Sequence, residues 1–285
     1  MEVFRTQIRM EKKLYMSYNI KRKNYFVNGG GKMRIGFFDS GVGGITVLHE
    51  ALRQLPAENY IYYADTKNVP YGTKSKLEVR KYILQAVDFM ANEGIKALVV
   101  ACNTATSIAI NELRQKYSFP ILGMEPAVKP AVEKNCTKRV LVAATPLTLQ
   151  EEKYKNLITK LGHPHIIDGV ALPELVEYAE NSIFEEQIIL AYLKQKLGSY
   201  NLKDYGTVVL GCTHFPFYQE VFRKLFPEDT YIIDGNKGTI KYLKKVLAEK
   251  NLSADNGQGD IIFYSSGQRE PYESRYTNYL KIISE

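Results

Sequence analysis

The stretch Arg34-Ile-Gly-Phe-Phe-Asp39-Ser-Gly-Val-Gly-Gly44 is a short apolar run that ends in a polar, glycine-rich turn. It predicts a β-strand over Arg34–Asp39, because apolar residues fill consecutive positions, as in strands buried on both faces. Six further runs of this kind cover residues 60–65, 97–102, 120–124, 139–145, 207–212 and 231–234. Such strands, separated by helical stretches, indicate an α/β protein with parallel sheets that helices cover on both faces.

Two sequences of the form Ser/Thr-x-x-Glu predict helix starts between the strands. The first, Ser75-Lys-Leu-Glu78, is followed by apolar residues at helical spacing from Val79 to Met90, until Gly94 ends the element. The second, Thr148-Leu-Gln-Glu151, predicts another helix by the same signal. The C-terminal residues 253–285 read as a loop, one short strand beginning at Ile261 and a helix, and we assign them no functional role.

Two of the three cysteines occupy equivalent positions at predicted strand ends. Ala101-Cys102-Asn103-Thr104 and Gly211-Cys212-Thr213-His214 each follow a run that contains Val-Val, and each cysteine stands close before a threonine. Parallel sheets bind ligands outside the carboxyl ends of their strands. We therefore predict two similar α/β units that face each other, with one thiol from each in a shared cleft. Cys136 follows no strand, and we predict a structural or surface role for it.

The composition is that of a globular protein, with 285 residues of which 45% are hydrophobic and 24% charged. The longest clean apolar run, residues 97–102, is much shorter than the roughly 20 residues of a membrane helix, and the basic N-terminus lacks the apolar stretch of a secretory signal. Three cysteines without a Cys-x-x-Cys pair favour reduced thiols over a disulfide framework. These features predict a soluble cytoplasmic protein.

The net charge of +7 is concentrated in the basic arm, residues 1–32, whose eight lysines and arginines and two glutamates give +6. The arm ends in Asn28-Gly-Gly-Gly31, which is typical of a flexible joint before Met33. A non-essential arm, or a true start at Met33, is favoured over an arm that binds nucleic acid, which stays open as an alternative. The other residues are close to neutral, so they predict no nucleic-acid partner.

Two thiols that face each other suit proton exchange at a carbon atom. One base removes the proton from one face while an acid on the opposite face delivers another, and the stereocentre is inverted without a redox step. A neighbouring histidine, a helix N-terminus or hydrogen-bond donors lower the pKa of a thiol and make it a usable base, and both Cys102 and Cys212 lie where a helix is expected to begin. Either cysteine alone fits equally well as a small buried hydrophobic residue, so the prediction depends on the matched pair.

Four motifs, in this order and spacing, resemble the glutamate racemases of the aspartate/glutamate racemase superfamily: Asp39-Ser-Gly-Val-Gly-Gly44, Val69-Pro-Tyr-Gly72, Ala101-Cys-Asn-Thr-Ala105 and Gly211-Cys-Thr-His-Phe-Pro216. The resemblance implies two similar α/β domains with the active site in the cleft between them, and we place residues 33–124 and 236–285 in the first domain and 125–235 in the second. It also implies an isomerase that needs no cofactor and is commonly a homodimer. Its product, D-glutamate, would enter peptidoglycan and so serve cell-wall biogenesis and cell shape.

The resemblance assigns roles to the matched residues. Cys102 would exchange the proton with D-glutamate and Cys212 with L-glutamate, with Asp39 assisting the first thiol and His214 the second. The segment Leu172-Pro-Glu-Leu-Val-Glu177 matches the family's longer proline-containing stretch only loosely, so no role follows for Glu177. No metal is implied.

A glutamate zwitterion needs many hydrogen-bond donors for its two carboxylates and an acceptor for its ammonium group. The matched motifs supply hydroxyl, amide and backbone donors, and Asp39 could accept from the ammonium. The threonines among them are also placed to cap helices, which is the commoner role of any one of them. The predicted substrate-binding residues are Asp39, Ser40, Tyr71, Gly72, Asn103, Thr104, Thr145, Thr148, Thr213 and His214.

Three other interpretations stay open. Gly41-Val-Gly-Gly44 after one strand, with Asp65 after the next, is a partial dinucleotide-binding fingerprint, but Thr46 stands where its third glycine is expected. A metal site from the two cysteines and His214 lacks the spacing of zinc motifs. A superfamily racemase acting on aspartate or another amino acid would share both cysteines, although the histidine near the second favours glutamate. The remaining histidines, predicted to be ordinary surface or helix residues, are His49, His163 and His165.

Overall fold

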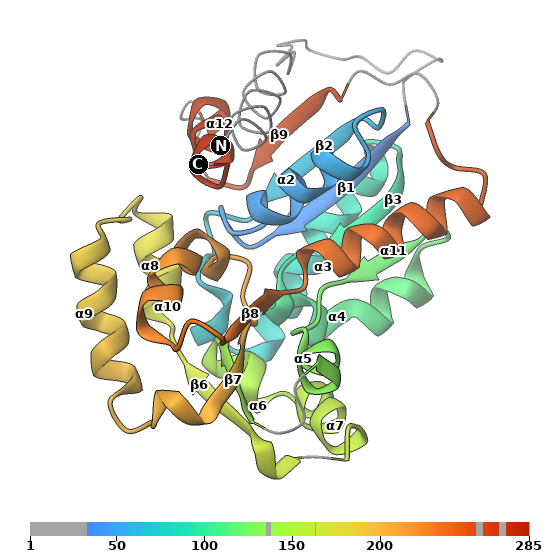
Figure 1. Ribbon diagram of the computed structural model, residues 1–285. Helices are drawn as coiled ribbons and strands as arrows, with labels where there is room; N and C mark the ends of the chain where they lie inside the picture. The colour runs from blue at the N-terminus through green and yellow to red at the C-terminus, as the bar shows by residue number, and fades with distance from the viewer. Residues whose placement is uncertain (1–32, 135–137, 163, 255–258, 268–271, 285) are drawn as a thin grey trace, which may run out of the picture.

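Two parallel β-sheets, each with helices on both faces, make up the protein (Figure 1). The computed structural model describes residues 33–134, 138–162, 164–254, 259–267 and 272–284. The basic arm, Cys136 and His163 lie outside these residues. The predicted α/β class is confirmed. Among the described residues, no helix is long and apolar enough to cross a membrane.

The first sheet has the strand order β4-β3-β1-β2-β9, and all neighbouring strands are parallel. Its strands are β1 (Arg34–Asp39), β2 (Tyr60–Ala64), β3 (Ile95–Val100), β4 (Ile121–Gly123) and β9 (Ile261–Ser265). Successive side chains of a strand point to opposite faces. Phe37 therefore belongs to the core shared with α2 (Ile45–Gln54), α11 (Asn236–Glu249) and α12 (Tyr272–Ile282), whereas Phe38 belongs to the core shared with α3 (Lys76–Asn92) and α4 (Asn103–Lys116). Burial on both faces explains why these strands are apolar throughout.

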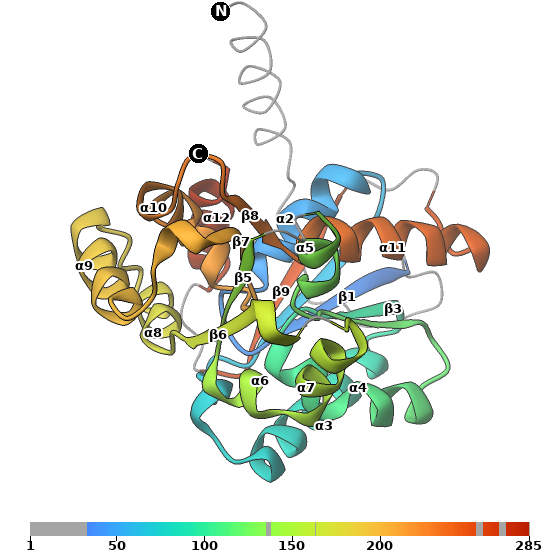
Figure 2. The same ribbon diagram turned by 60° about the horizontal axis from the view of Figure 1, so that its bottom comes forward.

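The second sheet has the order β6-β5-β7-β8 and is also entirely parallel. Its strands are β5 (Arg139–Ala144), β6 (Ile167–Ala171), β7 (Tyr205–Leu210) and β8 (Tyr231–Asp234). Helices α5 (Val128–Lys134) and α7 (Glu152–Lys160) share one core with this sheet, and α8 (Glu174–Glu180), α9 (Glu186–Leu197) and α10 (Gln219–Leu225) share the other (Figure 2). Short elements complete the fold: α6 (Pro146–Gln150) and the 3₁₀ turns η1 (Tyr71–Thr73), η2 (Pro164–Ile166), η3 (Leu202–Asp204) and η4 (Phe215–Tyr218).

The chain passes between the two sheets twice. After β4 it reaches α5 through residues 124–127, and after β8 it returns through Gly235 into α11, which packs against α2. The two crossings lie against each other, since a Cβ atom at Gly235 would stand 2.4 Å from the sulfur of Met124. A side chain at this position would force the crossings apart.

The seven strands predicted from the sequence are all present, and their observed bounds differ from the prediction by at most two residues. The predicted C-terminal strand is β9, and the predicted helix after it is α12. The sequence analysis missed β6. This strand lies at the edge of its sheet and buries only Val170, so its sequence lacks the apolar run that identified the others.

The two predicted helix starts have different outcomes. The first is confirmed, because the Ser75 hydroxyl accepts from the Glu78 backbone N–H, the Glu78 side chain accepts from the Ser75 N–H, and the helix ends before Gly94, whose φ is +73°. The second, at Thr148, is wrong. Helix α6 begins at Pro146, with the Thr145 hydroxyl accepting from the Thr148 N–H, and α7 begins separately at Glu152. Pro146 at the first helical position places the cap at the residue before it, Thr145, which is three residues before the predicted cap.

Candidate active site

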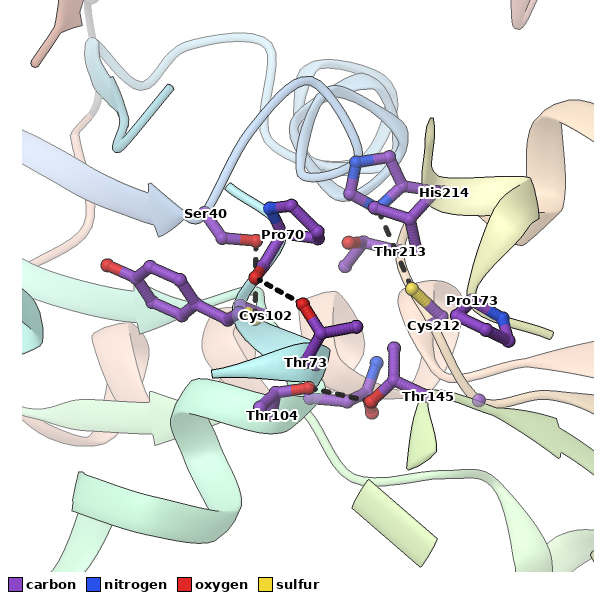
Figure 3. A pocket seen from close by; sticks show the side chains of 15 residues that line it. Ser40, Pro70, Thr73, Cys102, Thr104, Thr145, Pro173, Cys212, Thr213 and His214 are labelled. Atoms are coloured by element: carbon purple, nitrogen blue, oxygen red, sulfur yellow. Dashed lines mark hydrogen bonds between the residues drawn. The ribbon is translucent and has the colours of Figure 1, made fainter. Parts of the chain in front are cut away.

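A small pocket lies where the carboxyl ends of strands from both sheets meet (Figure 3). It encloses about 20 Å³, which is room for about one water molecule. Most of the predicted site residues line it, namely Ser40, Tyr71, Gly72, Cys102, Asn103, Thr104, Thr145, Cys212, Thr213 and His214. Two further predicted residues, Asp39 and Thr148, lie directly behind this wall, where they are hydrogen-bonded to lining residues. The structure thus brings all the predicted site residues together.

The Cys102 thiol lies on the side of the pocket formed by the first sheet. Cys102 follows β3 and is the N-cap of α4, where its sulfur accepts a hydrogen bond from the Ala105 N–H at 3.4 Å. The thiol donates toward the Ser40 hydroxyl oxygen at 3.7 Å (Figure 3). Burial, and after it the negative charge of Asp39, raises the pKa of Cys102 to about 12. The Ala105 N–H at the helix start lowers this pKa as expected, but in a fully buried site the loss of hydration outweighs that donor, so the net shift of the Cys102 pKa is upward.

The Cys212 thiol lies on the opposite side of the pocket and has an imidazole as its partner. Cys212 follows β7, and its sulfur is 3.6 Å from Nδ1 of His214 (Figure 3). On the other edge of the ring, Nε2 of His214 is 2.8 Å from a carboxylate oxygen of Glu180. Burial alone would lower the pKa of His214, but the hydrogen bonds to Cys212 and Glu180 outweigh it and raise this pKa above its usual range. The arrangement favours an imidazolium that donates to the sulfur and to the carboxylate at once.

Asp39, at the end of β1, joins the two sides of the pocket. It is fully buried, and its two oxygens accept from the Gly41 N–H at 3.0 Å and from the Thr213 hydroxyl at 3.1 Å. Burial raises the pKa of Asp39 to about 6, against the lowering effect of His214. Asp39 therefore changes its charge at about pH 6, and its negative charge acts on the Cys102 thiol.

The glycine-rich turn after β1 is shaped by close neighbours. A Cβ atom at Gly41 would stand 1.7 Å from a carboxylate oxygen of Glu180, and one at Gly43 would stand 2.4 Å from the Thr213 hydroxyl oxygen. The Val42 N–H donates to Glu180 at 2.7 Å. Protein groups thus occupy the space that a dinucleotide phosphate would need, which argues against the dinucleotide-binding interpretation.

A triangle of threonine hydroxyls connects the two sheets beside the pocket. Thr104 at the start of α4 lies 3.0 Å from both Thr145 and Thr148, which follow β5 and lie 2.9 Å from each other. A Cβ atom at Gly72 would stand 2.6 Å from the Cβ of Thr145, so the turn η1 also approaches the second sheet closely. These threonines combine the two expected roles, since Thr145 caps α6 and also lines the pocket.

Two polar groups of the lining differ in how they are held. The Tyr71 hydroxyl donates to Asp65 at 2.5 Å, and Asp65 also accepts from the amide of Asn68 and from the hydroxyl of Ser266, so the η1 turn is fixed from behind. Asn103, in contrast, has a buried side-chain oxygen with no hydrogen-bond partner among the described residues. An unpaired acceptor that is buried at a pocket wall is available to a ligand donor.

Glu180 is the functional residue that the sequence analysis missed. It ends α8, three residues after the loosely matched segment, and contacts His214 and the turn after β1, whereas Glu177, the residue considered in that segment, is exposed. The sequence signal that could have indicated it is indirect, because the close approach of the Glu180 side chain explains why residue 41 is a glycine. His165 is exposed as predicted, but His49 is partly buried in α2, where it is hydrogen-bonded to Ser284.

No group of three or more histidine, cysteine, aspartate or glutamate side chains suited to hold a metal ion occurs among the described residues.

Comparison with known proteins agrees with this geometry. The Asp/Glu/Hydantoin racemase family matches residues 39–243. The chain is 59% identical over 254 residues to the glutamate racemase of Halothermothrix orenii, covering 89% of this chain and all of that one, and 55% identical to glutamate racemase 2 of Bacillus subtilis, covering 89% and 97%. The crystal structure of glutamate racemase isoform RacE1 from Bacillus anthracis superimposes with a TM-score of 0.80 at 32% identity, covering 87% of this chain and 94% of that one.

Proposed function

The chain belongs to the Asp/Glu/Hydantoin racemase family, and from that membership we propose that it is a glutamate racemase that inverts the α-carbon by proton exchange with Cys102 and Cys212. The observation that carries the mechanism is the placement of the two thiols. They come from the equivalent ends of β3 and β7, both are buried, and both line one pocket from its two sides. The proposed chemistry uses no cofactor, because the two thiols supply the base and the acid and the fixed hydrogen-bond donors of the pocket stabilise the negative charge that develops at the substrate.

In the direction from L- to D-glutamate, the Cys212 thiolate removes the α-proton and the Cys102 thiol delivers its own proton to the opposite face. At the end of the step Cys212 is a thiol and Cys102 a thiolate, so the net charge is unchanged. The raised pKa of Cys102 supports this direction for the free protein, because it keeps Cys102 protonated near neutral pH. The return of a proton to Cys102 and its loss from Cys212 restore the starting state.

His214 supplies the positive charge that stabilises a Cys212 thiolate during the reaction. An imidazolium at 3.6 Å from the sulfur stabilises the thiolate, and Glu180 keeps the ring in place through the 2.8 Å contact. Asp39 takes the corresponding place near Cys102. Its charge disfavours a resting Cys102 thiolate, and we propose that it assists the proton transfer there once the substrate ammonium offsets that charge.

The substrate carboxylates are proposed to bind to hydroxyls of Ser40, Thr104, Thr145 and Thr213 and to the backbone amides at Tyr71 and Gly72. The buried side-chain oxygen of Asn103 is an acceptor for the ammonium group. These fixed donors also stabilise the negative charge that develops when the α-proton leaves. Because the pocket has room for about one water molecule, glutamate binding requires its walls to move apart.

The reaction product, D-glutamate, is proposed to supply peptidoglycan synthesis in the cytoplasm. We further propose domain boundaries at residues 33–124 with 236–285 and at 125–235, which separate the two sheets. A homodimer is proposed by analogy with the family. Light scattering coupled to size-exclusion chromatography tests it, because a dimer has twice the 32.5 kDa of the chain.

The activity is tested by circular dichroism of the purified protein with L-glutamate, D-glutamate and L-aspartate in separate reactions without added cofactor. We expect optical activity to decay to zero from both glutamate enantiomers and to persist with aspartate. Decay of the optical activity with aspartate alone would support the same mechanism with aspartate, and not glutamate, as the substrate. Persistence with all three would contradict the proposed function.

A further inference from the structure

Helix α12 lies beyond the family match and brings a cation to the rear of the active site. The match ends at residue 243, whereas α12 covers Tyr272–Ile282 and packs against α2 and β9. From this helix, Nη2 of Arg275 donates to the backbone oxygen of Glu180 at 2.5 Å and to its carboxylate oxygen Oε2 at 3.2 Å. The arginine thus contacts the last residue of α8, where it satisfies a terminal carbonyl as well as a carboxylate.

These contacts extend the partners of Cys212 into a chain of four residues. Arg275 binds Oε2 of Glu180, Oε1 of Glu180 binds Nε2 of His214, and Nδ1 of His214 reaches the sulfur of Cys212. We propose that Arg275 is a positioning residue for the Cys212 half of the reaction, acting through the orientation of Glu180 and His214. This inference rests on the proposed racemase function, and it assigns a role to the C-terminal helix.

The two oxygens of Glu180 have separate partners, and this separation makes Arg275 consequential. Oε1 accepts from Nε2 of His214 and from the Val42 N–H, while Oε2 accepts from Arg275. The last torsion of a glutamate side chain is broad, so without a partner on Oε2 the plane of the carboxylate, and Oε1 with it, can turn away from the imidazole. The imidazole would then lose the fixed acceptor that holds its ring toward Cys212.

The surroundings limit other ways of holding this carboxylate. The side chain of Glu180 is 10% exposed and lies so close to Gly41 that no Cβ atom fits between them. The charged partners of Glu180 among the described residues are His214 in front and Arg275 behind. Arg275 is 38% exposed, so solvent screens part of its charge and the expected effect of its loss is about tenfold rather than complete.

The hydrogen-bond partners of Cys102 are different, and this allows a selective test. Cys102 contacts Ser40 in the turn after β1 and the Ala105 N–H in α4, whereas Arg275 contacts Glu180 at the end of α8. If Arg275 acts through His214, its removal slows only the step at Cys212. A loss of general stability would instead affect both thiols.

The kinetic test compares Arg275→Met with the native chain, using glutamate deuterated at the α-carbon. We expect kcat/KM to fall about tenfold in both directions, since the two enantiomers are equal in free energy. The deuterium isotope effect on kcat/KM should rise with L-glutamate, whose bond is broken at Cys212, and should fall toward one with D-glutamate. Arg275→Lys, which keeps a cation, should restore part of the rate. Unchanged isotope effects would overturn the proposal even if the rate falls.

A second measurement does not depend on racemase activity. Alkylation of each cysteine by iodoacetamide, followed by peptide mass spectrometry, should show Cys212 reacting several-fold more slowly in Arg275→Met and Cys102 reacting at the native rate. Arg80→Met is the matched control, because Arg80 also pairs with a glutamate, Glu112, but on the exposed surface. Equal slowing at both cysteines, or no slowing at Cys212, would overturn the role of Arg275. If the native protein racemises no amino acid while alkylation is slowed at Cys212 alone in Arg275→Met, the proposed function fails and the positioning role of Arg275 stands.

Discussion

The two thiols of the pocket have equivalent backbone positions but different chemical surroundings. Cys102 and Cys212 each follow a central strand of a parallel sheet, and each is less than a tenth exposed. Cys102 contacts the Ser40 hydroxyl and a backbone N–H and lies near the charge of Asp39. Cys212 instead contacts the His214 imidazole, which is held by a carboxylate that is in turn paired with a guanidinium. The repeated fold therefore places the thiols, and side chains from unrelated elements give each thiol its own surroundings.

The largest effect should come from removing either thiol. Cys102→Ala and Cys212→Ala are each expected to lower kcat/KM at least about 10³-fold in both directions, because every turnover uses one thiol to remove and the other to supply a proton. Circular dichroism with each enantiomer measures this loss. Cys136→Ala serves as the control and should keep full activity. Full activity of either active-site variant would remove the two-thiol mechanism.

The next largest loss of activity should come from removing the hydrogen-bond partner of one thiol, and it should differ between the two thiols. His214→Asn should lower kcat/KM about 10²-fold or more, because the acid–base partner of Cys212 is lost. Ser40→Ala should lower it only about fivefold, since a neutral hydrogen bond contributes on the order of 1 kcal/mol. With α-deuterated glutamate, the isotope effect on kcat/KM should rise for L-glutamate in His214→Asn, because the step at Cys212 is slowed. It should rise for D-glutamate in Ser40→Ala, because the step at Cys102 is slowed. Equal losses in the two variants would show that the halves do not differ as described.

A smaller difference is expected in the reactivity of the resting thiols. With a pKa of about 12, only about one Cys102 in 10⁴ is a thiolate at pH 8. Cys212, at nearly the same exposure, has the His214 imidazole beside it. Iodoacetamide should therefore modify Cys212 at least about tenfold faster than Cys102, as followed by mass spectrometry of the two peptides. Faster modification of Cys102 would reverse the assignment of resting acid and base.

A further effect concerns the pH dependence of stability, to which two buried groups contribute with opposite signs. The pKa of Asp39 is raised from 3.8 to about 6, mainly by burial, so the folded protein binds the proton more tightly than the unfolded chain and loses stability as pH rises from about 4 to 6. The pKa of His49 is lowered from 6.5 to about 4, mainly by burial, so the unfolded chain binds the proton more tightly and stability rises over about pH 4 to 6.5.

Denaturant unfolding at several pH values tests these signs. Asp39→Asn should remove the falling contribution and His49→Gln the rising one, each by at most about 1.4 kcal/mol per pH unit. The change in slope should therefore be positive in the first variant and negative in the second. The same sign in both variants would contradict the burial argument for one of them.

The sequence was sufficient for those features that depend on local pattern. Buried strands such as Arg34–Asp39 are identified by continuous apolar residues, and α3 by its capping box and helical spacing. β6 could not be identified in this way, because an edge strand that buries only Val170 needs few apolar residues. The wrong helix start at Thr148 has a similar cause, since two threonines three residues apart compete for one cap and Pro146 decides between them.

The candidate site was predictable where its residues stand in motifs at strand ends. Both cysteines, the threonines beside them and His214 were found in this way, and they line one pocket. Glu180 and Arg275 were not found, because their roles depend on where α8 and α12 pack against distant elements. The raised pKa of Cys102 was also missed, since the extent of its burial is a property of the folded pocket and not of the helix start.

The central claim, proton exchange through two thiols, is tested most directly by the first turnover in D₂O. L-glutamate is incubated with the protein until a small fraction has reacted, the enantiomers are separated, and the α-position of each is examined by proton NMR. Two thiols on opposite faces predict that the D-glutamate formed carries deuterium at the α-carbon while the recovered L-glutamate still carries hydrogen. Deuterium appearing in the recovered L-glutamate at the same rate, or hydrogen retained in the product, would indicate a single base and contradict the account.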